Sequence, residues 1–145
     1  MELKIKKLNN NAIVPCKATE GSAGMDLYAC IDTPITIKPF ERALIPTGIA
    51  AALPSNDYAI FLFARSGLGI KYGIALANGV GVVDSDYRGE ICVGLQNSSN
   101  TSYTINPNDR IAQMVVMPVC SPEIIVVNQL DETERNAGGF GSTGK

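Results

Sequence analysis

The chain contains no histidine. This absence removes the commonest general base, the usual zinc ligand and any Ser-His-Asp triad. Catalysis would therefore have to use carboxylates, a hydroxyl, lysine or a metal bound through oxygen. No apolar stretch approaches the ~20 residues that cross a bilayer, and no signal-peptide-like run follows the N-terminus. We therefore expect a cytoplasmic protein with no membrane partner.

Basic residues and paired cysteines are also scarce. The chain has 12 Lys and Arg against 14 Asp and Glu, a formal net charge of −2. Nucleic-acid binding usually needs a basic surface, so we expect no nucleic-acid partner, although a few local cations could hold a small polyanion. Cys16, Cys30, Cys92 and Cys120 form no C-x-x-C pair. This spacing favours reduced, mainly buried thiols over a zinc site or a disulfide framework.

What the chain does contain is a series of short β-branched and aromatic runs separated by Gly, Pro and Asn. Its 145 residues suit one domain with a real core. The candidate strands are residues 3–6, 34–38, 43–52, 58–63, 79–83, 90–95, 102–105, 111–119 and 124–130. The best helical candidate is a short turn at residues 66–72, which Ser66 could cap. The pattern predicts an all-β, single-domain sandwich or barrel. Residues 111–119 are apolar on both faces, which suggests that one face meets another subunit.

Two segments in the first half of the chain carry polar groups that suit a nucleotide. Residues 23–29 place Asp26 beside a glycine, where it could join the polar shell of a metal or phosphate; a simple turn is the alternative. Arg65, Ser66 and Gly67 follow an apolar strand and open the helical turn. Free N–H groups and a forked guanidinium there could bind an anion. The alternative is an ordinary helix start with a surface arginine.

A third segment runs from residue 78 to residue 90 and resembles an EF-hand loop only superficially. Arg88 occupies one position that needs an oxygen ligand, and Leu95 occupies the final Glu position. The segment is better interpreted as a β-hairpin with its tip near residues 84–89. Asn78 and the extended backbone near Val83 could then meet the edge of a base, with Asp84 facing the ligand. A solvated acidic turn is the alternative.

The last two segments are residues 107–114 and the C-terminal tail. Gln113 lies in an apolar strand, so it needs a polar partner or an exposed functional position. An edge-strand glutamine that faces water is the alternative. The tail, residues 138–144, offers many backbone N–H groups, two hydroxyls and one aromatic face, so it could wrap an anion and cover a flat ring. Residues 139–145 match the G-x-x-x-x-G-K part of the P-loop pattern, but no helix or Ser/Thr follows Lys145. A frayed tail is the alternative.

In this order and spacing, the five segments resemble the five motifs of the homotrimeric deoxyuridine triphosphatase (dUTPase) family. The resemblance runs from Ala23 to Gly144. It implies a distorted, jelly-roll-like barrel at residues 1–130 and a flexible glycine-rich arm at residues 131–145 that closes the active site of a neighbouring subunit. The implied activity is hydrolysis of dUTP to dUMP and pyrophosphate. This reaction keeps uracil out of DNA and supplies dUMP for thymidylate synthesis.

The resemblance also assigns roles around the nucleoside. Asp84 would be the general base that directs water to the α-phosphorus. Tyr87 would pack against the sugar and leave no room for a ribose 2′-hydroxyl. Asn78 and the backbone near Val83 would read the uracil edge.

The remaining implied roles concern the triphosphate. A second subunit would supply Arg65, Ser66, Gly67 and Gln113. The arm of a third would supply Phe140 and Gly141 at the uracil ring, and Arg135, Ser142 and Thr143 at the γ-phosphate. Mg²⁺ would bridge the phosphates, with Asp26 in its outer shell through water.

The chain departs from the family pattern at two places. Ala64 stands where many members have Pro, and Asn136 stands where Gly is usual. Asn tolerates a left-handed backbone fairly well, so we expect the arm to remain functional.

Two other functions were weighed against this one. A deoxycytidine triphosphate deaminase shares the fold but carries a glutamate in a G-x-I-x-L-E pattern, and Gly94 occupies that position here. A non-catalytic nucleotide-binding trimer is the second alternative. The presence of Asp84, Arg65, Gln113 and a complete tail argues against lost activity.

Overall fold

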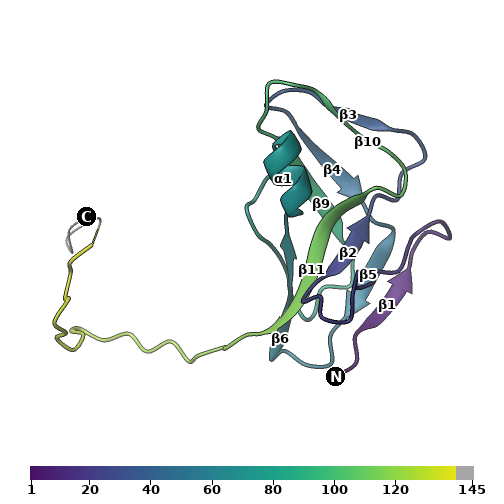
Figure 1. Cartoon of the computed structure of the whole chain (residues 1–145). Coiled ribbons are helices and arrows are strands. Elements are labelled where there is room, and N and C mark those ends of the chain that lie inside the picture. The colour runs from purple at the N-terminus through teal and green to yellow at the C-terminus, as the bar shows by residue number, and fades with distance from the viewer. Residues whose placement is uncertain (140–145) are drawn as a thin grey trace.

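The computed structural model describes residues 1–139, which form eleven strands and one helix (Figure 1). In chain order the elements are β1 (Lys4–Lys7), β2 (Met25–Tyr28), β3 (Ile35–Ile37), β4 (Arg42–Pro46), β5 (Ile49–Ala52), β6 (Tyr58–Phe63), α1 (Ser66–Tyr72), β7 (Ile74–Leu76), β8 (Gly81–Val83), β9 (Cys92–Asn97), β10 (Tyr103–Ile105) and β11 (Arg110–Pro118). The predicted all-β class with one short helix is confirmed.

The strands pair in four sheets, and every pairing is antiparallel. The largest has the order β2-β11-β6-β8, and a second has the order β4-β9-β7. Two smaller sheets pair β1 with β5 and β10 with β3. Within residues 1–139 the arrangement is therefore a jelly-roll-like sandwich of separate sheets and not a closed barrel.

One hydrophobic core lies between these sheets. Alternate residues of β9 face inward, so that Val93 and Leu95 are buried while their neighbours are half-buried. Leu27 of β2, Ile60 of β6 and Met114 of β11 join them from the largest sheet. Short strands are sufficient here because each contributes one or two large side chains to a shared interior.

The predicted strand at residues 43–52 is two strands, β4 and β5, which belong to different sheets. The chain turns between them at Thr47 and Gly48, where Gly48 has φ +69°. An added Cβ there would lie 2.7 Å from both Ala12 Cβ and Cys30 Sγ, so only glycine fits. β2 and β7 were not predicted, because four and three residues are too few for a recognisable alternation.

The predicted strand at residues 124–130 is absent. Its large apolar side chains, including Ile124 and Val126, are exposed, and the chain has no regular secondary structure from Cys120 to Gly139. Figure 1 shows this segment leaving β11 and extending away from the rest of the molecule. A strand needs a hydrogen-bonding partner, and the described part of the chain supplies none there.

Two further local predictions were wrong. β8 pairs with β6, whereas β9 pairs with β4 and β7, so residues 84–91 cross between sheets and are not the tip of a hairpin. Ser66 is the first helical residue of α1, and Arg65 occupies the N-cap position without a side-chain capping bond. The N–H of Gly73 ends the helix by donating to the carbonyls of its last turn.

Candidate active site

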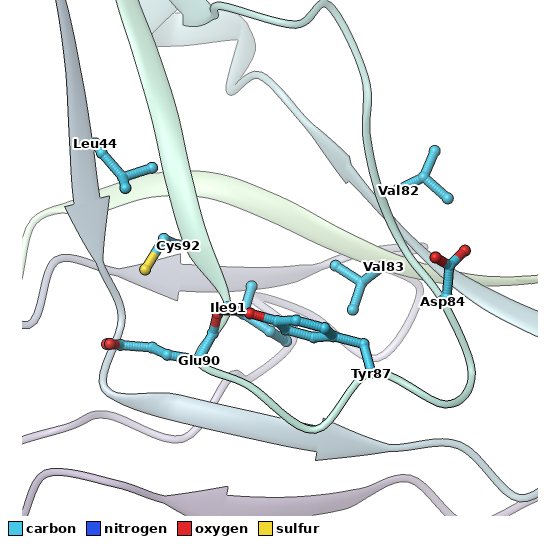
Figure 2. Close-up of a pocket in the computed structure, with 8 residues that line it drawn as sticks. All are labelled: Leu44, Val82, Val83, Asp84, Tyr87, Glu90, Ile91 and Cys92. Atoms are coloured by element: carbon cyan, nitrogen blue, oxygen red, sulfur yellow. Dashed lines mark hydrogen bonds between the residues drawn. The ribbon is translucent and has the colours of Figure 1, made fainter.

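A pocket of about 350 Å³ opens where β8 ends and β9 begins (Figure 2). Three predicted site residues line it together: Val83, Asp84 and Tyr87. Leu44, Val82, Glu90, Ile91 and Cys92 complete its walls. The sequence did not single out these five residues as site residues. A carboxylate and a thiol close to Asp84 in the sequence, Glu90 and Cys92, were the signal that could have indicated these pocket residues.

Asp84 lies at the rim of this pocket, directly after β8. Val83 is held in register opposite Ile60 of β6, so the start of the loop is fixed by the largest sheet. The Asp84 carbonyl accepts a hydrogen bond from the Tyr87 N–H at 3.2 Å, which closes the turn between them. The Asp84 side chain is exposed. An exposed carboxylate on a fixed backbone can orient a water molecule against a ligand in the pocket.

The Tyr87 ring folds back over Gly89. Its hydroxyl donates to the Glu90 carbonyl at 3.0 Å. A Cβ on Gly89 would overlap the Tyr87 hydroxyl, so a side chain there would displace the ring. The glycine therefore allows a flat aromatic surface to form one wall of the pocket, which Figure 2 shows beside Ile91.

A second group of predicted residues gathers around the buried carboxylate of Asp26. Asp26 is 4% exposed. Its Oδ1 lies 3.3 Å from Arg65 Nε, and its Oδ2 accepts a hydrogen bond from Arg110 Nη1 at 3.2 Å. Among the described residues Oδ1 accepts no hydrogen bond of good geometry, so this contact with Arg65 is a charge contact only. Two guanidiniums offset the cost of burying one carboxylate.

Arg110 was not predicted as a site residue, although it opens an apolar strand. Its carbonyl also accepts a hydrogen bond from Arg65 Nη1 at 3.1 Å. The Arg65 side chain is consequently tied to β11 and to β2. A charged residue at the start of such a strand was the signal that could have indicated it.

Gln113 lies next to this charged group on β11. It pairs with Asp26 on one side and with Phe63 on the other, and it is half-buried. It is therefore not on an edge strand. Ser66 and Gly67 begin α1, which is separated from the end of β6 by two residues, and a Cβ on Gly67 would meet nothing within 4 Å. The helix start is open to the approach of a ligand.

The two groups lie at opposite ends of β6. Val83 pairs with Ile60, which places Asp84 near the beginning of β6, whereas Arg65 follows its end. Six residues of strand span roughly 20 Å. A single chain therefore does not bring Asp84 and Arg65 to the same phosphate.

The predicted base-reading residue, Asn78, lies in an exposed turn after β7. Its carbonyl accepts a hydrogen bond from the Val80 N–H at 2.9 Å, and Gly79 adopts φ +74°. This turn precedes β8, whereas Asp84 follows it. Asn78 is not among the residues that line the pocket.

Part of the predicted phosphate clamp lies in the C-terminal segment. Arg135 is exposed, and its Nε donates to the Gly138 carbonyl at 2.8 Å. Asn136 has φ +43°, the left-handed backbone that asparagine was expected to tolerate. Phe140, Gly141, Ser142 and Thr143 lie outside the described residues.

The four thiols are free, as expected, but the prediction that they are mainly buried was wrong. Cys16 and Cys120 are exposed, and Cys30 and Cys92 are half-buried. Burial, followed by the charge of Glu90, raises the pKa of the Cys92 thiol above its ordinary value. The same two causes lead the rise in the pKa of Cys30.

Residues 1–139 lack two further features. These residues contain no group of three or more Cys, Asp or Glu side chains that could hold a metal by themselves. They also contain no helix that is long and apolar enough to span a membrane.

Comparison with known proteins is consistent across sequence and structure. The family model for dUTPase matches residues 10–144. The deoxyuridine 5′-triphosphate nucleotidohydrolase of Paraburkholderia xenovorans is 47% identical over all of this chain and 98% of the relative. The enzyme of the same description from a Janthinobacterium species is 49% identical over all of this chain and 97% of the relative.

Solved structures share the fold along nearly the whole chain. A point mutant of the Staphylococcus bacteriophage 80alpha dUTPase, solved with dUpNHpp, is 26% identical with a TM-score of 0.89 over 99% of both chains. A dUTPase mutant of phage phi11 of S. aureus, in which a structural Mg(II) ion was described, is 23% identical with a TM-score of 0.81 over 91% of this chain and 100% of that one. Given the family match and the full-length relatives, the chain belongs to the dUTPase family.

Proposed function

We propose that this chain is a dUTP diphosphatase that hydrolyses dUTP to dUMP and pyrophosphate in the cytoplasm. Full-length relatives that are 47% and 49% identical carry the description deoxyuridine 5′-triphosphate nucleotidohydrolase. A structural neighbour binds dUpNHpp, an analogue of the triphosphate. The reaction keeps uracil out of DNA and supplies dUMP for thymidylate synthesis.

The observation that carries the site assignment is the separation of Asp84 from Arg65 along β6. Both belong to the family pattern, yet one chain holds them roughly 20 Å apart. A homotrimer resolves this, because Asp84 of one copy can meet Arg65 of another. The apolar faces of β11 and the exposed apolar residues at 124–130 support association between copies.

Asp84 acts as the general base. Its exposed carboxylate accepts a proton from a water molecule as that water attacks the α-phosphorus in line with the leaving pyrophosphate. One positioned carboxylate is sufficient, because phosphoryl transfer depends mainly on alignment and on neutralising charge. The lack of histidine is therefore no obstacle to this chemistry.

The nucleoside occupies the pocket beside Asp84. Tyr87 packs against the deoxyribose and leaves no space for a 2′-hydroxyl. The backbone near Val83, which lines the pocket, reads the edge of uracil together with Asn78 from the turn before β8, outside the pocket lining. This selects uracil over cytosine.

The triphosphate is held by donors from two other copies. Arg65, Ser66, Gly67 and Gln113 of a second copy contact the α- and β-phosphates. Arg65 is already pre-aligned by Asp26 and Arg110. The arm of a third copy, residues 131–145, brings Arg135, Phe140, Gly141, Ser142 and Thr143 over the ligand. Closure excludes water and completes the phosphate clamp.

The residues present fit a Mg²⁺ ion that is carried by the triphosphate and not by the protein. Residues 1–139 hold no multidentate metal group. Among the described residues, one oxygen of the buried Asp26 carboxylate accepts no hydrogen bond. Asp26 could therefore accept hydrogen bonds from waters of the ion. When bound, Mg²⁺ neutralises charge on the phosphate oxygens.

A pyrophosphate-release assay across dUTP, UTP, dTTP and dCTP tests this function. We expect hydrolysis of dUTP in preference to all the others. Deaminated product from dCTP would instead support the deaminase, although Gly94 leaves that site without its carboxylate. Binding of dUpNHpp without turnover of any triphosphate would support a non-catalytic protein.

A further inference from the structure

Tyr87 can exclude a ribose only if its ring is held in one place. The contacts that hold the ring involve residues to which the family resemblance assigns no role. Tyr87 as a whole is 46% exposed, so packing alone does not immobilise its ring. Its only hydrogen bond among the described residues is the one from its hydroxyl to the Glu90 carbonyl, at 3.0 Å. The position of the ring therefore depends on where the Glu90 backbone lies.

The Glu90 backbone is held by its own side chain. Glu90 Oε1 accepts a hydrogen bond from the Gly48 N–H at 2.7 Å. Gly48 packs closely against Ala12 and Cys30, since an added Cβ would lie 2.7 Å from a side-chain atom of each. The Gly48 carbonyl also accepts a hydrogen bond from the Leu8 N–H at 2.7 Å. The turn between β4 and β5 is thus a rigid anchor.

The two residues that flank Gly48 hold Ile91 in the same way. The hydroxyl of Thr47, which is 1% exposed, donates to the Ile91 carbonyl, and the Ile91 N–H donates to the Ile49 carbonyl at 2.9 Å. Three consecutive residues therefore hold residues 90 and 91. Two of these contacts use a side chain, that of Thr47 and that of Glu90. Thr47 is buried, so only the Glu90 contact can be altered without disturbing the core.

Glu90 is itself a carboxylate in the pocket, so a direct chemical role has to be considered. Figure 2 shows its side chain directed away from Asp84. After burial, its charge is the next cause that raises the pKa of both Cys30 and Cys92, which agrees with a carboxylate directed toward the β4–β5 turn. The Glu90 carboxylate already accepts a hydrogen bond from Gly48 and is directed away from Asp84. It is therefore placed to position the backbone and not to transfer a proton.

We propose that Glu90 is a positioning residue for sugar discrimination: the Gly48 N–H anchors its carboxylate, and its carbonyl then holds the Tyr87 hydroxyl where the ring excludes a 2′-hydroxyl. The proposal rests on the proposed dUTP hydrolysis. It assigns part of the selectivity to a residue that does not touch the sugar.

The test is the ratio of kcat/KM for dUTP to kcat/KM for UTP in full-length variants. Glu90→Ala should lower this ratio about five- to tenfold, which corresponds to one hydrogen bond. Glu90→Gln keeps an oxygen that can accept from Gly48, so it should stay within about twofold of the wild-type ratio. Tyr87→Phe keeps the ring but not the hydroxyl, and should lower the ratio as much as Glu90→Ala. The double variant should be no worse than either single one.

Four results would contradict the proposal or the function on which it rests. A Glu90→Ala protein that loses rate equally on both substrates would reduce Glu90 to a structural residue and overturn the proposal. Equal losses of selectivity in Glu90→Ala and Glu90→Gln would point to charge and overturn it too. If Glu90→Ala does not fold, an unchanged ratio in Tyr87→Phe still refutes it. Wild-type protein that releases no pyrophosphate from dUTP would refute the proposed function itself, a result that no variant ratio can mimic.

Discussion

At the scale of single residues, the chemistry of the proposed site depends on a few polar groups that the surrounding backbone fixes. Asp84 and Asp86 are two exposed acids on one turn, but only Asp84 lines the pocket. This difference allows a direct test of the base, since the neighbouring acid provides a matched control.

We expect Asp84→Asn to lower kcat by about 10²- to 10⁴-fold, because the amide cannot take the proton from water. Pyrophosphate release measures the loss, and dUpNHpp titration should show that binding survives. Asp86→Asn should retain most of the activity. A rate in Asp84→Asn close to that of the wild type, or an equal loss in Asp86→Asn, would contradict the assignment.

The thiol of Cys92 reports on the same pocket. Burial and the Glu90 charge raise its pKa, so at a given pH a smaller fraction is thiolate than in an ordinary cysteine. We expect iodoacetamide to label Cys92 more slowly than the exposed Cys120 at pH 8, with the difference shrinking as the pH rises. Mass spectrometry of the labelled peptides measures both rates. Equal labelling at pH 8 would show that the pocket does not shelter the thiol.

At the scale of elements, the orientation of α1 is set by the contacts at its C-terminal end. Gly73 adopts φ +68°, and a Cβ there would lie 3.0 Å from the Ser99 backbone nitrogen and Cβ. The Gly73 carbonyl also accepts a hydrogen bond from the Ser98 N–H at 2.8 Å, which joins the end of the helix to the end of β9. The Ser98 hydroxyl donates to the same carbonyl at 2.9 Å. The short helix is therefore oriented by the turn at its C-terminal end, since its N-cap makes no side-chain bond.

We expect Gly73→Ala to lower the free energy of unfolding by about 1–2 kcal/mol, because the left-handed backbone disfavours a Cβ and Ser99 crowds it. Gly69→Ala is the control. It lies within the same helix, its nearest neighbour would be 3.8 Å away, and alanine favours a helix by up to about 1 kcal/mol. Urea unfolding of both variants measures the contrast. A Gly73→Ala protein as stable as Gly69→Ala would contradict this account.

At the scale of the whole molecule, the proposed site needs residues from more than one copy of the chain. Asp84 and Arg65 are separated by the length of β6, and the C-terminal segment extends away from the sheets. Both features are expected if each copy contributes residues to the site of a neighbouring copy. Activity should then depend on the combination of subunits and not only on their number.

Deleting residues 136–145 should leave a folded oligomer with little activity, because the sheets and β11 are unaffected while the arm is lost. Light scattering should give three times the mass of one chain, and the pyrophosphate assay should show the loss. Turnover equal to that of the full chain would exclude a role for the arm.

Mixing subunits provides a sharper test. Full-length Asp84→Asn chains have an arm but no base, and truncated chains have a base but no arm. Unfolding and refolding them together should restore part of the activity in mixed oligomers, because one composite site can take each part from a different copy. Failure to restore any activity, with mixed oligomers detected, would mean that each site is built from a single chain.

The sequence by itself predicted the fold class from its residue pattern and the activity from its resemblance to one family. The alternating short runs predicted an all-β fold, and the absence of histidine restricted the available general bases. The resemblance of the five ordered segments to the dUTPase motifs then implied a nucleotide hydrolase with Asp84 as its base. Such features are local, since they depend on residue type, spacing and turn propensity.

Only the tertiary structure decided which strands pair and which site residues meet. Residues 84–91 have turn-forming composition, but whether they link partner strands or cross between sheets depends on long-range packing. The role of Glu90 likewise depends on Gly48, 42 residues away in sequence, whose N–H it meets only because β4 and β5 turn beside β9. Contacts of this kind follow from the way the core closes, and no local pattern encodes them.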